Sequence, residues 1–292
     1  MTSTTDPVFA HSIQPLLNNY DAFIIDLWGV IHDGQTLYPG VLEALELLQE
    51  HHKHVIFLSN APRRAKKAKL VLDRLRITPA LYQHIITSGE VTFDQLTSGQ
   101  LSLGNRFVII GPDKDDDLLN EASSLTFVDD ISNADFIVAT GFNEDDSTIE
   151  EVRPELSKAL DLQLPMICAN PDIEVVRIDG SRALCAGVMA EFYQANGGNV
   201  ISFGKPYPEV YHYCMQHLQN MDHSRIAVIG DNLDTDIKGG NTQSLDSYLI
   251  AGGILAEQFN IRHGELPEKN ALMALCTQKN IFPTGVLAAF QR

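Results

Sequence analysis

Residues 22–34 read AFIIDLWGVIHDG, and this stretch decides how the rest of the chain is interpreted. Its first part, residues 22–25, is a continuous apolar run, which is typical of a strand buried on both faces of a parallel sheet. The run ends in Asp26, which is followed by a turn. In open α/β sheets, ligands bind outside the carboxyl ends of the strands. The stretch therefore predicts a buried strand that delivers a carboxylate to a ligand site.

The same pattern continues outward along the chain, because short apolar runs alternate with segments of helical periodicity. Helices are expected from Val41, behind Pro62 and over residues 147–160, while the C-terminal residues show only one amphipathic helix. Strands alternating with helices indicate right-handed βαβ units and a mostly parallel sheet of the α/β class. The predicted strands cover residues 22–25, 55–58, 84–87, 106–110, 135–139, 165–168, 199–203, 226–229 and 247–250.

Composition limits the classes of function. The chain has 292 residues, of which 44% are hydrophobic, enough for one large or two moderate domains. Its four cysteines form no C-x-x-C pair and no apolar run could span a bilayer, which favours a soluble, cytoplasmic protein. The formal net charge of −17 opposes nucleic-acid binding, and the basic run 63–69 lacks interleaved aromatic residues. We therefore interpret that run as a solvated helix face.

Functional side chains follow four of the predicted strands. Asp26 follows the first, Ser59 and Asn60 follow the second, Lys205 follows the run 199–203, and Asp231 follows the run 226–229. We expect all of them at one edge of a single sheet, since the carboxyl ends of parallel strands meet there. A carboxylate can attack phosphorus, paired carboxylates suit Mg²⁺, and a lysine with a hydroxyl can hold phosphoryl oxygens. The set predicts a site for phosphate chemistry.

In this order, the segments DLWGVIHDG, LSNAPR, GKPYPEVY and GDNLDTDI resemble the four motifs of the haloacid dehalogenase (HAD) superfamily. The long insert between the second and third motifs, with NPD at residues 170–172, is similar to the NagD and para-nitrophenylphosphatase branch. The resemblance implies a doubly wound, parallel-sheet core of residues 1–88 and 198–292, with a second α/β domain, the cap, inserted as residues 89–197. It also implies a homodimer through the cap, with a monomer as the alternative.

The resemblance further implies a role for each residue. Asp26 would be the nucleophile and a Mg²⁺ ligand, and Ser59 and Lys205 would grip the phosphoryl group. The implied substrate is a small phosphorylated metabolite such as a sugar, nucleotide or aryl phosphate. The remaining ligands would be the backbone carbonyl of Trp28 and the side chain of Asp231, with Asp236 in the outer shell, while Asn60, Asn170 and Asp172 would contact the substrate.

One position departs from the resemblance. The family usually has D-x-D, in which the second Asp protonates the leaving group, but here that position is Trp28. Indole has no acid–base function near neutral pH, and losing such a group typically costs roughly 10²–10⁴ in rate. Three interpretations stay open. The first is a slow phosphatase that uses another proton donor, such as His32 or Asp33, or substrates with good leaving groups. The others are a hydrolase of C–halogen or C–P bonds and a protein that binds a phosphorylated ligand without turnover.

Overall fold

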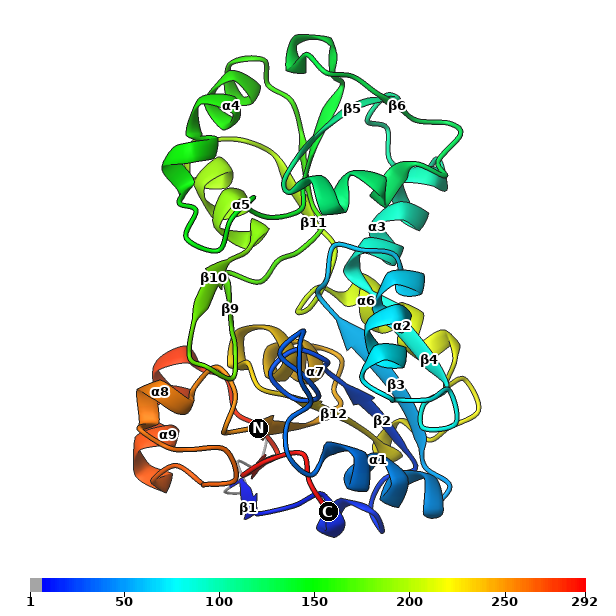
Figure 1. Ribbon diagram of the computed structural model, residues 1–292, viewed down its shortest axis with the longest axis vertical. Helices are drawn as coiled ribbons and strands as arrows, with labels where there is room; N and C mark the ends of the chain where they lie inside the picture. Colours follow the sequence, from blue (N-terminus) through cyan, green and yellow to red (C-terminus); the bar gives the residue numbers. More distant parts are fainter. Residues whose placement is uncertain (1–6) are drawn as a thin grey trace.

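Two parallel sheets, one in each part of the molecule, organise the structure (Figure 1). The computed structural model describes residues 7–292, apart from the side chains at positions 114 and 116. The first six residues of the predicted core therefore lie outside the described range. The core sheet has seven parallel strands in the order β1 (Val8–Ala10), β14 (Gly285–Leu287), β13 (Asp246–Ile250), β12 (Ile226–Gly230), β2 (Ala22–Ile25), β3 (His54–Ser59) and β4 (His84–Thr87).

The second sheet lies in the cap and has five parallel strands. Their order is β11 (Val200–Ser202), β8 (Met166–Cys168), β7 (Phe136–Ala139), β5 (Arg106–Ile110) and β6 (Thr126–Phe127). A separate antiparallel hairpin, β9 (Glu174–Val176) and β10 (Arg182–Leu184), extends from the cap toward the core (Figure 1). The predicted α/β class, with a doubly wound core and an inserted α/β cap, is confirmed.

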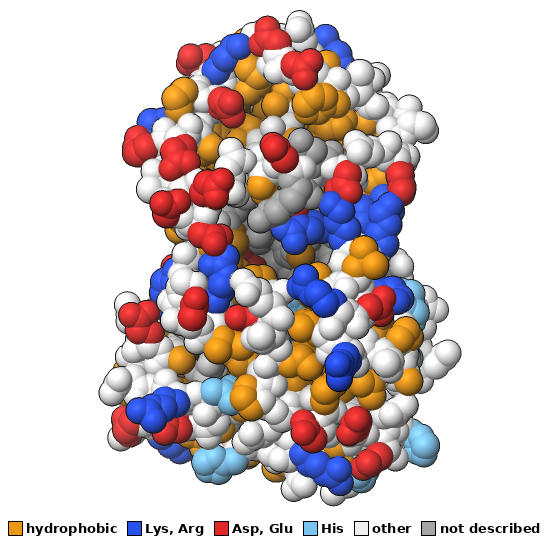
Figure 2. Space-filling model, viewed as in Figure 1, with side chains coloured by type: hydrophobic (Ala, Val, Ile, Leu, Met, Phe, Trp, Pro, Cys, Tyr) orange, Lys and Arg blue, Asp and Glu red, His pale blue; other side chains and the backbone are white. Residues whose placement is uncertain are grey.

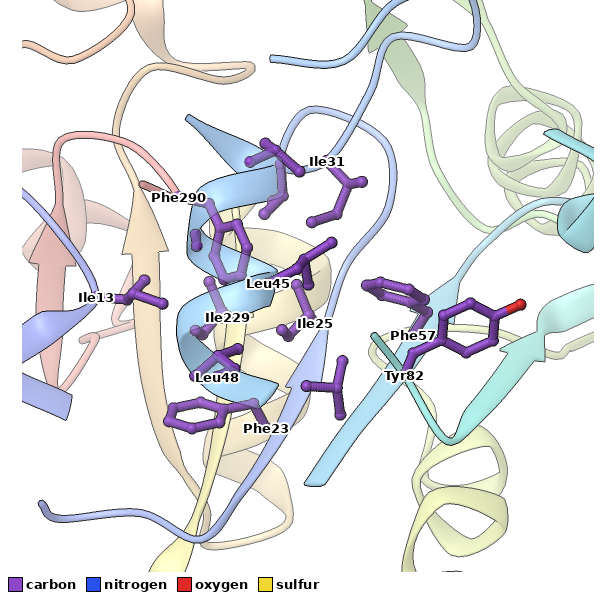
Figure 3. Packing of buried hydrophobic residues seen from close by; sticks show 14 of the residues in the cluster. Ile13, Phe23, Ile25, Ile31, Leu45, Leu48, Phe57, Tyr82, Ile229 and Phe290 are labelled. Atoms are coloured by element: carbon purple, nitrogen blue, oxygen red, sulfur yellow. The ribbon is translucent and has the colours of Figure 1, made fainter. Parts of the chain in front are cut away.

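Helices cover both faces of the core sheet. On one face α1 buries Leu45 and Leu48 against Phe23, Ile25 and Phe57, as Figure 3 shows. The helices are α1 (Val41–Glu50), α2 (Ala65–Arg74), α3 (Ser88–Thr97), α4 (Ile149–Asp161), α5 (Ala186–Ala195), α6 (Pro208–Gln216), α7 (Lys238–Thr242), α8 (Ala256–Phe259) and α9 (Lys269–Lys279), with short turns η1 (Gln14–Leu16), η2 (Asp113–Leu119), η3 (Ile131–Asn133), η4 (His223–Arg225) and η5 (Leu233–Ile237). Within residues 7–292, none of these helices combines the length and apolarity needed to cross a membrane.

On the other face, the apolar packing does not stop at the domain boundary. One cluster includes Ile24 and Val228 of the core sheet, Tyr211 of α6, and Phe136 and Ile167 of the cap sheet. All five side chains are buried, so apolar surface continues from the core into the cap through α3 and α6. Since burying such side chains is the main stabilising term in folding, core and cap stabilise one another.

The predicted strands are all present, but one lies in the other sheet. We expected residues 199–203 in the core, whereas β11 pairs with β8 of the cap, with Val200 opposite Met166 and Ser202 opposite Cys168. The predicted boundary at residue 198 is therefore too early, because the chain completes a cap strand before it returns to the core. Two core strands, β1 and β14, were not predicted, because each has only three residues and too little pattern to be recognised.

Candidate active site

Three buried carboxylates meet at the carboxyl end of the core sheet. Asp26 follows β2, Asp231 follows β12, and Asp236 lies on the π-helical turn η5. One carboxylate oxygen from each lies within 4.8 Å of the others. Adjacent parallel strands β2 and β12 bring Asp26 and Asp231 together, because their registers align Ile25 with Ile229. Three such oxygens around one point form a ligand set suited to a hard divalent cation.

The backbone closes tightly around Asp231. A Cβ added at Gly29 would lie 2.1 Å from Asp231 Oδ2, and one added at Gly253 would lie 2.2 Å from the same atom. The backbone N–H of Ile254 also donates to Asp231 Oδ2 at 2.8 Å. Only glycine fits at positions 29 and 253 without displacing the carboxylate, so the local sequence fixes this side chain in the cluster.

Lys205 provides the positive charge of the site. Its ammonium group hydrogen bonds to Asp26 Oδ1 and to Asp236 Oδ1, the latter at 2.7 Å, and the side chain is 3% exposed. Lys205 reaches this position from β11 of the cap sheet and not from a core strand, which corrects the expectation of a single sheet. The side chain of Asn60 holds its backbone, accepting from Lys205 N at 2.7 Å and donating to Lys205 O at 3.1 Å.

The electrostatics of the cluster favour a bound cation. Burial raises the pKa of Asp26 well above its usual range, although Lys205 opposes this shift. Burial and the neighbouring Asp236 raise the pKa of Asp231 to about 7. Burial alone would lower the pKa of Lys205, but Asp236 and Asp26 raise it well above its usual range. One ammonium cannot neutralise three carboxylates, so the site is short of positive charge.

The backbone carbonyl of Trp28 is also free to bind a cation. Among the hydrogen bonds of residues 7–292, none is accepted by this carbonyl, although the neighbouring carbonyl of Leu27 accepts from both Ile31 and His32. The carboxylates of Asp26 and Asp231, together with this carbonyl, thus fit the oxygen ligands that Mg²⁺ requires.

The end of β3, where Ser59 and Asn60 lie, is linked to the cap through Ser88. Ser59 is buried, and its Oγ accepts from the backbone N–H of Ala61 at 3.2 Å. Ser88 was not predicted as part of the site, yet its buried hydroxyl lies 2.8 Å from Asn60 O and also contacts Ala169 O of the cap. Ser88 directly follows β4, so the same strand-end rule that selected Ser59 would have found it.

The indole of Trp28 contacts the cap hairpin. Its Nε1–H donates to Val176 O in β9 at 2.8 Å, and its ring packs against Gly34, where a Cβ would lie 2.7 Å from Cζ3. Nearby, Asp33 accepts from the backbone N–H of Ile178, in the turn between β9 and β10, at 3.4 Å. Trp28 is thus a contact between the core and the cap hairpin.

The cap residues predicted to contact substrate lie at the end of β8. Asn170 is buried, and its Oδ1 accepts from the backbone N–H of Asp172 at 3.2 Å. The carboxylate of Asp172 accepts from Asn60 Nδ2 at 2.8 Å, and the same Nδ2 donates to Lys205 O, so Asn60 links the cap to the core. All the predicted site residues, from both domains, therefore line one cavity of about 640 Å³. Figure 2 shows Lys and Arg side chains gathered at the waist between the two domains.

The basic run 63–69, just before and within α2, is a solvated face only in part, because Lys66 and Lys69 are 60% and 46% exposed while Arg64 is 15% exposed. Arg63 donates to the buried Asp115 at 2.6 Å, and Lys67 pairs with Asp117 at 2.6 Å. Lys66 pairs in turn with Glu121. The cap partners of this run were not predicted, because they lie about 50 residues later in the chain and a helical pattern alone does not reveal them.

Two parts of this chain match known families of hydrolases. Residues 23–123 match the haloacid dehalogenase-like hydrolase family, and residues 202–268 match a second HAD hydrolase-like family. A D-glycerol 3-phosphate phosphatase from Mycobacterium tuberculosis is 25% identical over 250 residues, covering 83% of this chain and 66% of the relative. A crystal structure of a glycerol phosphate phosphatase from that organism, in complex with magnesium, has a TM-score of 0.63 at 22% identity, covering 82% of this chain and 70% of the other.

Two further solved structures extend over nearly the whole chain. The 4-nitrophenylphosphatase from Thermotoga maritima has a TM-score of 0.68 at 24% identity, covering 93% of this chain and 95% of the other. A haloacid dehalogenase-like hydrolase from Brucella suis 1330 has a TM-score of 0.81 at 30% identity, covering 96% of this chain and 98% of the other. The predicted resemblance is confirmed, and this chain belongs to the haloacid dehalogenase-like hydrolases.

Proposed function

We propose that the protein is a Mg²⁺-dependent phosphatase that hydrolyses a small phosphorylated metabolite through an aspartyl-phosphate intermediate on Asp26. The observation that carries the proposal is the meeting of Asp26, Asp231 and Asp236 with Lys205 at the floor of one cavity. The relatives named as phosphatases support a phosphate ester as the substrate, and the magnesium complex of one of them supports the metal.

In this proposal, Asp26 is the nucleophile. Its carboxylate attacks phosphorus, the bond from phosphorus to the ester oxygen breaks, and water then hydrolyses the acyl phosphate to regenerate Asp26. Lys205, already in contact with Asp26, balances the negative charge that spreads over the phosphoryl oxygens, and the Ser59 hydroxyl donates a hydrogen bond to one of them. Asn60 fixes Lys205 through two backbone hydrogen bonds, so the ammonium is oriented before substrate binds.

The metal has a defined role in this scheme. Asp26, Asp231 and the Trp28 carbonyl would hold Mg²⁺, with Asp236 in the outer shell, where it also holds Lys205. When bound, the ion supplies the positive charge that keeps the buried carboxylates ionised and polarises the phosphoryl group. The relatives named as phosphatases favour cleavage of a P–O bond over cleavage of a C–halogen or C–P bond.

A second candidate function is binding of a phosphorylated ligand without turnover, and Trp28 is the observation that favours it. A screen decides between the two. Purified protein with Mg²⁺ is incubated with a broad panel of sugar, nucleotide, cofactor and aryl phosphates, and released phosphate is measured. We expect slow, metal-dependent release from at least one ester. Tight binding of an ester with no release from any panel member would instead establish the binding function.

Two further parts of the proposal concern the protein's setting. We place the protein in the cytoplasm, which is supported by four buried cysteines that are all free thiols. We keep a homodimer formed through the cap as a proposal, with a monomer as the alternative. Light scattering on the purified protein, before and after substitutions on the outer face of the cap, distinguishes them.

A further inference from the structure

The proposed reaction needs a proton donor that the Trp28 position does not provide. As the phosphorus–oxygen bond of an alkyl ester breaks, negative charge builds on the leaving oxygen, and a positioned acid accelerates that step. The indole N–H of Trp28 is already donated to Val176 O. The donor must therefore be another titratable group that lines the cavity above Asp26.

The two neighbours in sequence do not suit this role. Asp33 accepts hydrogen bonds from Gln35, Thr36 and Ile178. Burial alone would raise its pKa, but these hydrogen bonds outweigh burial and lower the pKa of Asp33. For His32, burial lowers the pKa to about 4, and Nδ1 accepts from the Gly34 N–H, so the ring is neutral at physiological pH. Asp33 is thus ionised, and His32 is a weak acid in its neutral form.

Most other acids in the cavity wall are committed to ion pairs. Asp115 pairs with Arg63 at 2.6 Å, Asp145 pairs with Arg177 at 2.7 Å, and Glu174 pairs with Arg182. Each of these carboxylates is held by an arginine side chain, so it is less available to a leaving group than a carboxylate with a free oxygen. Glu144 also lines the cavity, but it is exposed.

Asp172 differs from all of these in its position. It enters from the cap at the end of β8, and its carboxylate oxygen Oδ1 accepts from Asn60 Nδ2 at 2.8 Å. The same Nδ2 lies 3.1 Å from the carbonyl of Lys205, whose ammonium contacts Asp26. In the described range 7–292, the second oxygen of Asp172, Oδ2, has no hydrogen-bond partner. One oxygen is thus anchored to the core while the other is available to the cavity.

The backbone holds Asp172 firmly in this place. Its N–H donates to Asn170 Oδ1 at 3.2 Å, and its carbonyl accepts from Gly187 N at 3.0 Å. A Cβ at Gly187 would lie 2.4 Å from that carbonyl, so only glycine allows this approach. A side chain positioned by two backbone hydrogen bonds and one side-chain hydrogen bond is preorganised, as an acid catalyst requires.

From this geometry we propose that Asp172, from the cap, is the general acid and then the general base of the reaction, in place of the carboxylate that Trp28 replaces. This inference rests on the proposed phosphatase function and assigns one more residue to it.

Asp172 gives one proton in the first step of the reaction and regains one in the second. In the first step, Asp26 forms a bond to phosphorus, the phosphorus–oxygen bond of the ester breaks, and protonated Asp172 gives its proton to the leaving oxygen. In the second step, water forms a bond to phosphorus, the bond from phosphorus to the Asp26 oxygen breaks, and the Asp172 carboxylate accepts a proton from that water. Inorganic phosphate leaves, and both side chains return to their starting states.

The charge environment agrees with this assignment. Burial raises the pKa of Asp172 to about 6, with Asp236 adding to the shift and Lys205 and Asn60 opposing it. The charged groups that act on Asp172 are Lys205, which follows cap strand β11, and Asp236 and Asp231 of the core. The thiol of Cys185, just before α5, also faces Asp172. A pKa near the working pH allows one carboxyl group to donate a proton in one step and to accept one in the next.

Asp172→Asn tests the proposal, because the amide can still accept from Asn60 Nδ2 yet has no acidic proton. Two substrates are compared: 4-nitrophenyl phosphate, whose leaving group is a stable anion, and the alkyl phosphate that the wild-type protein hydrolyses fastest. We expect kcat/KM for the alkyl phosphate to fall by about 10²–10⁴-fold. The first-turnover burst of nitrophenolate should change by less than about threefold, followed by slow turnover, because attack by water also loses its base.

A pH profile and a matched control sharpen the test. In the wild-type protein, kcat/KM for the alkyl phosphate should fall as the pH rises through the pKa of Asp172, and Asp172→Asn should flatten that fall. Asp130→Asn makes the same chemical change on the cap away from the cavity lining, where the carboxylate is 57% exposed, and should leave both substrates unaffected. The unfolding temperatures of both variants show whether the fold is retained.

The outcomes separate this inference from the function on which it rests. Equal losses on both substrates, or no loss on either, would overturn the role of Asp172 while leaving the phosphatase function in place. Hydrolysis of aryl phosphates alone by the wild-type protein would also overturn it, because no acid would then be acting. Absence of any hydrolysis by the wild-type protein would overturn the phosphatase function itself, and the role of Asp172 with it.

Discussion

The two walls of the cavity are built by the same rule but carry different chemistry. At the carboxyl ends of the core strands lie charged groups, Asp26 and Asp231, buried and held by backbone contacts. At the carboxyl ends of β7 and β8 in the cap lie the neutral side chains of Thr140 and Asn170, with the carboxylate of Asp172 two residues farther along. Lys205 links the two, because it follows a cap strand and ends in the core cluster. The core wall is thus suited to the phosphoryl group and metal, and the cap wall to the rest of the substrate.

The largest effect should come from the core wall. Asp26→Asn removes the nucleophile, so we expect phosphate release to fall by about 10⁴-fold or more. The variant should remain folded, because asparagine has nearly the same shape. Asp234→Asn serves as a control, since that carboxylate follows the same strand as Asp231 but pairs with Lys279 at the surface. Comparable losses of phosphate release in both variants would mean that loss of a negative charge at this edge of the sheet lowers activity, and would contradict nucleophilic attack by Asp26.

The second-largest effect should come from removing the metal from the core wall. Chelation should abolish phosphate release, and Mg²⁺ at 100 times its dissociation constant should raise the free energy of unfolding by about 2.7 kcal/mol. Thermal denaturation with and without Mg²⁺ measures the second effect independently of activity. Asp231→Asn should remove most of that stabilisation. An unfolding temperature that does not respond to Mg²⁺ would contradict the ligand set.

A smaller effect is expected where the cap is attached to the core. Asp115→Asn breaks the ion pair with Arg63, in which Asp115 is 2% exposed, and should lower the free energy of unfolding by about 1–2 kcal/mol. Asp73→Asn, in the exposed pair with Lys69, should cost at most about 0.5 kcal/mol. Urea denaturation of both variants measures the difference. Equal costs would show that the contact between α2 and η2 contributes no more than a surface ion pair.

The smallest effect should come from the cap hairpin. Trp28→Phe keeps an aromatic ring against Gly34 but removes the hydrogen bond to Val176 O, which is worth about 1 kcal/mol. We expect KM to rise about fivefold with kcat little changed, because the hairpin closes less firmly over the substrate. Steady-state kinetics on the best substrate measures both. A large fall in kcat with unchanged KM would instead place Trp28 in the chemical step.

The sequence was most informative where one strand carries both its own pattern and its functional residue. Ala22–Ile25 is buried on both faces and ends in Asp26, so strand and site could be predicted together. The short strands β1 and β14 could not, because three residues hold too little pattern and their pairing joins the two ends of the chain. Contacts between distant segments, such as those of Trp28 with Val176, depend on tertiary packing that local periodicity does not encode.

Individual site residues also differ in how well the sequence predicted their positions. The acidic motif at Asp231 predicted the correct neighbourhood, because β12 lies directly beside β2 in the sheet. Lys205 was expected from a core strand, because a strand followed by a lysine has the same pattern in either sheet. Only the pairing of Ser202 with Cys168 distinguishes the two, and that pairing depends on which domain the chain has reached.

The most direct test of the central claim is the mass of the protein during a single turnover. Protein with Mg²⁺ is mixed with its best phosphate ester, quenched in acid within one turnover, and analysed by peptide mass spectrometry. We predict one added phosphoryl group on the peptide that contains Asp26, and none in Asp26→Asn. Release of phosphate with no phosphoryl group on Asp26 at any time point would contradict the account.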